Sequence, residues 1–411
     1  MHKSLPIFLS LASSAFAVQN QSCAPTPPVC HSTDPCNCQY CLGPAQTIAN
    51  APCRPKTCNG DWMITVAGFY WNAHQDGMEY AIDNHIENPG SSLQNVLQLN
   101  NVIDAQYKTP DFNWNFGFKV GIGYNTTCDG WDFGVTWTRY RGDAKDHIEA
   151  EVDDNHTLVP LWSAFAPAGG EVTFATDIQS FWRLKLNLFD IELGREFWTS
   201  KYLCIRPHIG LRVAFLDQNF ELQHKGGSWS ARTVFPQQEA LNNRVDLDND
   251  FKGVGVRAGF NSLWHFGCGW GVYGDLATSI VYGKFSVDHD EQNRFAEGFF
   301  SKTKILEAED SFRASRAMLD LGLGVQWSGM ICSCQYGLTI KLGWEQHLFF
   351  HQNQLWRVVR IGDQPPPIQM TSLPEQNQFG TLPNNTGENV HHQRRGTLDT
   401  QGATLTVVFE F

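Results

Sequence analysis

The chain ends in Gly402-Ala403-Thr404-Leu405-Thr406-Val407-Val408-Phe409-Glu410-Phe411, and this stretch decides how the rest is interpreted. Successive side chains of a strand point to opposite faces, so one face here is wholly apolar and ends in an aromatic residue. That face needs either the core of a soluble sandwich or the lipid around a membrane barrel. A C-terminal Phe with apolar residues at alternate upstream positions also resembles the signal read by the bacterial barrel assembly machinery. The residues that would form this signal are Leu405, Val407, Phe409 and Phe411.

Residues 1–17 have the parts of a secretory signal peptide. The basic His2-Lys3 precedes an apolar run from Leu5 to Ala12, and Ala15-Phe16-Ala17 provides a small-residue cleavage site. The run is too short to cross a membrane as a helix. We therefore predict an exported protein.

The composition fits a barrel better than a soluble domain. The 411 residues include 14 Trp and 36 Gly, and 13% are aromatic, yet no run of about eighteen strongly apolar residues follows the signal peptide. A barrel combines these features because only alternate residues meet lipid and aromatic residues gather at both interfaces. The net charge of −12 argues against a nucleic-acid partner.

Residues 18–60 form a separate Cys- and Pro-rich segment without apolar periodicity, which we place in the periplasm. Cys38-Gln39-Tyr40-Cys41 would suit zinc, but structural zinc sites usually need two such pairs, so no metal or other cofactor is expected. In an exported chain disulfides are favoured. The candidate cysteines here are Cys23, Cys30, Cys36, Cys38, Cys41, Cys53 and Cys58.

From residue 61 to 411 a period of two dominates, which predicts an all-β, transmembrane, antiparallel up-and-down β-barrel. Ten stretches are long enough to cross a bilayer as tilted strands of about 9–11 residues. They are 62–72, 112–124, 131–141, 178–190, 203–216, 251–264, 269–285, 312–328, 334–350 and 402–411. Ten is a minimum, and we expect about 12 to 14, because 73–111 and 351–401 each have room for a further pair. The apolar residues between Leu93 and Ile103 would equally suit a short amphipathic helix.

The connections alternate between short and long, as they do in outer-membrane barrels with short periplasmic turns and long external loops. The short ones are 125–130, 199–202, 265–268 and 329–333, and the long ones are 73–111, 142–177, 217–250, 286–311 and 351–401. This order places both ends of the barrel in the periplasm. The remaining cysteines all fall at short turns, so we expect disulfides at this rim, either within the chain or between neighbouring molecules. They are Cys128, Cys204, Cys268, Cys332 and Cys334.

Two regions carry a family resemblance. One runs from Asp111 to Asn125 (DFNWNFGFKVGIGYN) and continues as Asp129-Gly130-Trp131-Asp132, and the other joins Leu193-Gly194-Arg195-Glu196-Phe197 to the segment Arg206–Arg212 (RPHIGLR). Together they resemble the pore-forming major outer membrane proteins of Legionella and Chlamydia-related bacteria. The resemblance implies an outer-membrane porin. The Cys-rich segment departs from the Legionella pattern and is more like the disulfide-linked envelopes of chlamydial organisms.

In such a porin, the polar residues facing the lumen set conductance and selectivity. Alternation predicts the pore-lining residues Lys119, Arg183, Lys185, Arg206, His208, Arg212, Arg257, Lys341, Asp320 and Glu345. In 178–190 this assignment sends Trp182, Leu184, Leu186 and Leu188 to lipid. The acidic segment 142–177 is either a solvated loop or folds inward to oppose the basic wall.

The chain contains no nucleophile elbow, zinc-binding helix or phosphate loop, so we predict no enzyme. The expected function is passive diffusion of small hydrophilic solutes through a water-filled barrel. The alternative is a disulfide-linked structural envelope protein or adhesin with a closed barrel. Expected partners are outer-membrane lipid, the barrel assembly machinery, and either other copies of the chain or disulfide-linked envelope proteins.

Overall fold

The computed structural model describes residues 62–85, 105–126, 130–150, 156–165, 173–200, 202–229, 240–295, 302–331, 336–361 and 388–411. The predicted signal peptide, the Cys-rich segment 18–60 and the helix considered at 93–103 lie outside these ranges and stay predictions. Within the described ranges, no helix has the length and apolar character needed to cross a bilayer.

Ten antiparallel strands form a closed ring, in the order β11-β12-β13-β14-β17-β1-β5-β6-β8-β10 and back to β11. The ring closes between the first and last strands, with Val66 opposite Val407. This confirms the predicted barrel and the minimum of ten strands. The bounds are β1 Trp62–Gln75, β5 Trp114–Asn125, β6 Trp131–Glu149, β8 Asp177–Arg195, β10 Leu203–Lys225, β11 Ala240–Gly267, β12 Trp270–Phe295, β13 Lys302–Ile331, β14 Tyr336–Phe349 and β17 Leu398–Glu410.

The expected 12 to 14 wall strands are wrong for the described residues, although further strands exist where room was predicted. They pair with one another instead of entering the ring. β2 (Ala81–His85), β3 (Gln106–Lys108) and β7 (His156–Pro160) form one small sheet, and β15 (Trp356–Ile361) and β16 (Glu388–Gln393) form another. β4 (Asp111–Phe112) pairs with β6, β9 (Phe197–Trp198) pairs with β10, and η2 (Gly227–Trp229) is a single 3-10 turn.

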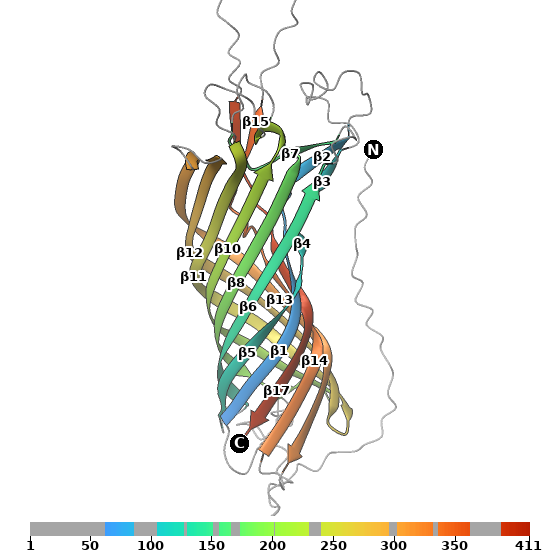
Figure 1. The fold of residues 1–411 in the computed structure, drawn as a ribbon. Helices are drawn as coiled ribbons and strands as arrows, with labels where there is room; N and C mark the ends of the chain where they lie inside the picture. The colour runs from blue at the N-terminus through green and yellow to red at the C-terminus, as the bar shows by residue number, and fades with distance from the viewer. Residues whose placement is uncertain are drawn as a thin grey trace, which may run out of the picture.

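The wall is higher on one side than on the other. β6, β8 and β10 to β13 have 19 to 30 residues, whereas β1, β5, β14 and β17 have 12 to 14. Figure 1 shows the long strands rising beside the small sheets, far from the C-terminus. The strands therefore extend into the predicted long loops, and β10 and β11 take up most of 217–250.

The lower zone, the half of the barrel nearest the C-terminus, turns its apolar residues outward. Leu405 and Val407 are 49% and 36% exposed, whereas the neighbouring Thr404 is buried. Exposed aromatic residues border this outer apolar band, with Trp62, Trp131, Trp264 and Trp270 at its lower edge and Tyr70, Trp114, Tyr282 and Trp344 towards its upper edge. An apolar band between aromatic girdles is the pattern of a lipid-facing barrel surface.

The upper zone, beyond that band, reverses this polarity. On β8, Trp182, Leu184, Leu186 and Leu188 are at most 3% exposed and face the interior, whereas Phe189, Ile191 and Leu193 face outward. The predicted lipid-facing row on β8 is therefore wrong. The strand outgrows the membrane, and above it water covers the outside while the interior becomes the apolar core.

Candidate functional site: the barrel interior

A layer of ionisable side chains spans the barrel interior between the two zones. We call it the charged layer. It consists of Lys119 on β5, Asp190 and Glu192 on β8, His208 and Arg212 on β10, Arg257 on β11, Asp320 on β13, and Glu345 and His347 on β14.

Arg212 is the most enclosed member of the layer, with 1% exposure. Its guanidinium donates to both carboxylate oxygens of Asp190, over 2.6 and 2.8 Å, and its Nη2 lies 2.7 Å from Oδ2 of Asp320. Nη1 also donates to the Ser279 hydroxyl at 3.2 Å. A buried guanidinium is tolerated when carboxylates and hydrogen bonds satisfy it in this way.

Asp320 connects three strands of the wall. Besides Arg212, it accepts from Nη2 of Arg257 at 2.8 Å, and Nδ1 of His347 lies 2.8 Å from its other oxygen. Arg257 additionally contacts Glu192 and approaches Nε2 of His208 at 3.1 Å. Side chains from β8, β10, β11, β13 and β14 therefore meet across the interior instead of lining separate patches of wall.

Lys119 joins the charged layer to the apolar core above it. Its Nζ lies 2.5 Å from Glu345 and 5.2 Å from the ring centre of Trp71, a cation–π contact. Trp71 is fully buried and donates its ring N–H to the Thr404 hydroxyl at 3.1 Å.

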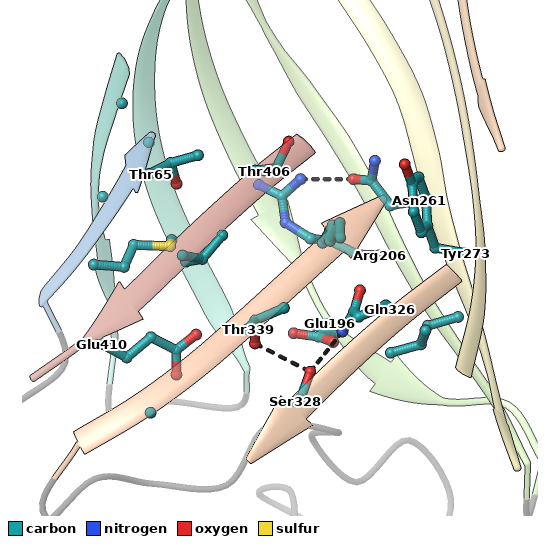
Figure 2. A pocket seen from close by; sticks show the side chains of 18 of the residues that line it. Thr65, Glu196, Arg206, Asn261, Tyr273, Gln326, Ser328, Thr339, Thr406 and Glu410 are labelled. Carbon is teal, nitrogen blue, oxygen red and sulfur yellow. Dashed lines mark hydrogen bonds between the residues drawn. The ribbon is translucent and has the colours of Figure 1, made fainter. Parts of the chain in front are cut away.

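Below the charged layer lies a cavity of about 530 Å³, lined by polar and apolar side chains (Figure 2). Arg206 lines this cavity and donates to both oxygens of Asp132 and, at 2.9 Å, to Asn261. Nζ of Lys341 lies 5.3 Å from the ring centre of Tyr273 in the same cavity. Thr65, Glu196, Gln326, Thr339 and Glu410 complete the polar lining.

Above the charged layer, apolar side chains fill the interior. Trp71, Trp182, Phe251 and Phe285 are at most 1% exposed and belong to one cluster. Segment 156–165 enters this cluster from above and buries Leu161 and Trp162. The interior therefore holds a cavity in its lower part, whereas the described residues pack its upper part.

A buried carboxylate holds the inserted segment in place. Glu291 accepts from the Ser163 hydroxyl at 2.6 Å, the Ala164 N–H at 2.7 Å and the Asn243 amide at 2.8 Å. Burial raises the pKa of Glu291. His224 contacts the same Asn243, and burial lowers its pKa to about 4.

The part of the acidic segment 142–177 that the structure describes folds inward through apolar side chains. Its residues Leu161 and Trp162 enter the core, and Asp146 accepts a hydrogen bond from the Tyr80 hydroxyl at 2.7 Å. Residues 151–155 and 166–172 lie outside the described ranges.

Most of the predicted pore-lining residues do face the interior. Lys119, His208, Arg212, Arg257, Asp320 and Glu345 meet in the charged layer, and Arg206 and Lys341 line the lower cavity. Arg183 and Lys185 do not. They point outward from β8 above the apolar band, and the Arg183 side chain is 61% exposed. The reversal of polarity along β8 explains this error.

The same error hid two acids of the layer, Asp190 and Glu192. Phe189, Ile191 and Leu193 alternate with these two acids, so assigning this apolar row to lipid would have placed both acids inside. His347 was also missed, although it shares its face of β14 with the predicted Glu345.

Two of the twelve cysteines lie in the described ranges. Cys204 is buried and disulfide-bonded, and Cys268 is an exposed free thiol in the turn after β11. The predicted pairing of the other cysteines falls outside these ranges and stays a prediction. At the same end, Phe411 exchanges backbone hydrogen bonds with Trp62, so the proposed assembly signal closes the ring.

Comparison with known proteins gives a family match. The sequence model described as "Legionella pneumophila major outer membrane protein precursor" matches residues 51–381. No individually curated protein matches the chain.

Solved structures with some likeness include the outer membrane protease OmpT of Escherichia coli, with 7% identity, a TM-score of 0.35, and coverage of 87% of this chain and 98% of that one. A Pseudomonas aeruginosa FadL homologue has 5% identity and a TM-score of 0.22, covering 85% and 90%. The toluene transporter TodX of P. putida has 8% identity and a TM-score of 0.23, covering 85% and 89%. At these TM-scores the likenesses carry no argument about what this chain does.

Proposed function

We propose a function from the premise that this chain belongs to the Legionella pneumophila major outer membrane protein family. It is therefore an outer-membrane protein. Within that membrane, we propose that it acts as a closed, rigid barrel whose upper zone projects above the bilayer as a packed domain. Its role is then structural, as an envelope component or an adhesin.

The observation that carries this proposal is the packed upper interior. A water-filled lumen leaves inward side chains solvated, whereas Trp71, Trp182, Phe251 and Phe285 are at most 1% exposed. Burying one such aromatic side chain stabilises a fold by roughly 1.5–3 kcal/mol, so an open path through this core is disfavoured. The charged layer adds a second barrier, because its side chains bind one another across the interior.

The test is electrical and osmotic. Folded protein is reconstituted into planar bilayers and liposomes beside a general porin. We expect no sustained conductance and no swelling in small sugars. Stable channels in the unmodified protein would contradict the proposal.

The second candidate is the diffusion channel implied by the sequence, in a gated form. It is favoured by the cavity of about 530 Å³, which reaches Glu192 of the charged layer from below. This channel would open only if the inserted segment left the core. In the unmodified protein, a gated channel should show brief openings in planar bilayers, whereas a closed barrel should show no conductance. The substitutions Leu161→Gly and Trp162→Gly loosen the inserted segment. A closed barrel should conduct only after these substitutions.

The structural role has a disulfide-linked form, in which thiols at the lower rim join neighbouring molecules. Cys268 is positioned for this because it is an exposed free thiol at the tip of a turn. Non-reducing gels of native envelopes test it: oligomers that collapse with reductant support the link, and monomer under both conditions contradicts it.

A further inference from the structure

Three cations lie side by side on the outer surface, immediately beyond the apolar band. Lys252 on β11 is directly opposite Lys284 on β12, and Lys284 is directly opposite Arg313 on β13. All three side chains are exposed. We call these residues the basic row.

Like charges directly opposite each other in a sheet destabilise it, and the basic row places three in succession. In the described part of the chain, no ion pair joins any of them to a carboxylate. Other outer-face cations higher up the same strands do have partners: Arg244 lies 2.8 Å from Asp246, and Lys304 lies 2.6 Å from Glu307. Lys284 and Arg313 therefore lack the close carboxylate partners that these neighbours have, and Lys252 has an electrostatic interaction with Asp250, two residues along β11, without a close ion pair.

The position of the row indicates what compensates it. Val254 and Tyr282, the outward residues directly below Lys252 and Lys284, are 53% and 54% exposed and belong to the apolar band. The row thus begins where the hydrocarbon ends, at the level of the lipid headgroups. With the ends of the barrel in the periplasm, as predicted, these headgroups belong to the outer leaflet.

We propose that the basic row binds the phosphate of an anionic lipid headgroup in the outer leaflet. Adjacent strands lie about 4.8 Å apart, so one phosphate placed between two of these side chains contacts both. Arg313 supplies a planar fork suited to two phosphate oxygens, and the lysines supply point charges. Because the whole chain carries a net charge of −12, attraction of an anion must come from a local feature such as this. The proposal does not depend on whether the barrel conducts.

The test measures binding of diphosphorylated lipid A to the folded, detergent-solubilised full-length protein by native mass spectrometry. The variant is Lys252→Gln, Lys284→Gln and Arg313→Gln together. The matched control removes the same charge from the upper zone, with Lys145→Gln, Lys225→Gln and Lys304→Gln. Heat-modifiable migration on gels establishes that each protein is folded.

We expect the row variant to lose at least tenfold in affinity and the control less than twofold. Equal losses of lipid A affinity in the row variant and the control would overturn the proposal, because binding would then follow the overall charge of the protein. Binding of phosphatidylcholine as tightly as lipid A by the unmodified protein would also overturn it. Displacement of the lipid by an equal concentration of inorganic pyrophosphate would assign the row to free phosphate and overturn the lipid site.

Thermal unfolding provides a second readout. In neutral detergent without lipid, the row variant should melt at the same temperature as the unmodified protein or higher, because repulsion has been removed. Added lipid A should raise the melting temperature of the unmodified protein and the control but not that of the row variant. An equal rise in all three would contradict the proposal.

Discussion

Phe189 and Asp190 are neighbours in β8, yet their side chains face opposite environments. Phe189 stacks on Trp137 on the outer surface, with ring centres 5.9 Å apart, while Asp190 binds Arg212 inside the barrel at 2.6 Å. Immediately above them, Leu188 faces the interior. The inward-facing side chains of β8 thus change from a carboxylate at Asp190 to an apolar group at Leu188. This change occurs at the level where the environment outside the barrel changes from lipid to water.

Replacing Asp190 with Asn should strongly destabilise the barrel. Arg212 would keep its burial but lose the carboxylate that it holds at two points. Removing one partner of a buried ion pair costs up to about 3–5 kcal/mol. Because Asp320 would still contact Arg212, we expect a loss below that limit but well above that of a surface pair. Urea unfolding of refolded protein in detergent, followed by tryptophan fluorescence, measures the change.

The matched control is Asp246→Asn, which removes one of the two carboxylates that pair with Arg244 on the outer surface. Exposed pairs contribute about 0–1 kcal/mol, so this variant should unfold close to the unmodified protein. If both variants lost equal stability, the charged layer would not be the buried network described above.

The sequence predicts most of the lower zone because the apolar residues of each alternating strand face outward there. The alternation of Trp114 to Tyr124 and of Leu319 to Trp327 places the correct face outward, and the apolar C-terminal row meets lipid as expected. Eight of the ten predicted pore-lining residues face inward for the same reason.

In the upper zone the apolar row faces inward, and alternation alone does not predict this. The pattern shows that a strand has one apolar face but not whether lipid or water lies outside the barrel. Trp182 to Leu188 alternate as regularly as the lipid-facing rows, so their pattern fits an inward face equally well. Nor does the sequence show that Arg212 has a second partner, Asp320 on β13, which is distant along the chain. This contact follows from the order of strands in the ring.

Cysteine labelling of intact cells tests the reversal on β8. Lys185→Cys should react with a membrane-impermeant maleimide, because residue 185 points outward above the apolar band, and Leu186→Cys should stay unlabelled in the core. The unsubstituted protein corrects for its native cysteines. Labelling of residue 186 and protection of residue 185 would restore the face assignment made from sequence.

Acidification should loosen the segment inserted from above. Burial lowers the pKa of His224 and of His289 to about 4, from an ordinary value of 6.5. A group whose folded pKa is depressed binds protons better when released, so the docked state loses stability as the pH falls from about 6.5 towards 4. Each histidine contributes up to about 1.4 kcal/mol per pH unit in this window. Glu291 acts oppositely, since its raised pKa favours the docked state on protonation.

Limited proteolysis between pH 7 and pH 4 measures this release, with a protease active across the range. We expect cleavage near residues 156–165 to increase below about pH 6, where His224 begins to take up a proton on release. The substitution His224→Gln keeps a polar group near Asn243 without titrating, and should flatten the response. A profile unchanged by His224→Gln would exclude this histidine as the cause.

Gly117, in the motif that carries the family resemblance, should not tolerate a side chain. Its inner face is covered by the ring of Phe69, and an added Cβ would overlap that ring. Gly117→Ala should therefore cost about 1–3 kcal/mol through overpacking.

The matched control is Gly68→Ala on the neighbouring strand, where an added Cβ meets nothing within 4 Å. In urea unfolding, Gly68→Ala should be neutral or slightly stabilising, and combining Gly117→Ala with Phe69→Leu should recover part of the loss. Equal losses from the two alanine substitutions would mean that glycine is needed at both positions for its backbone, and not at Gly117 for the Phe69 ring.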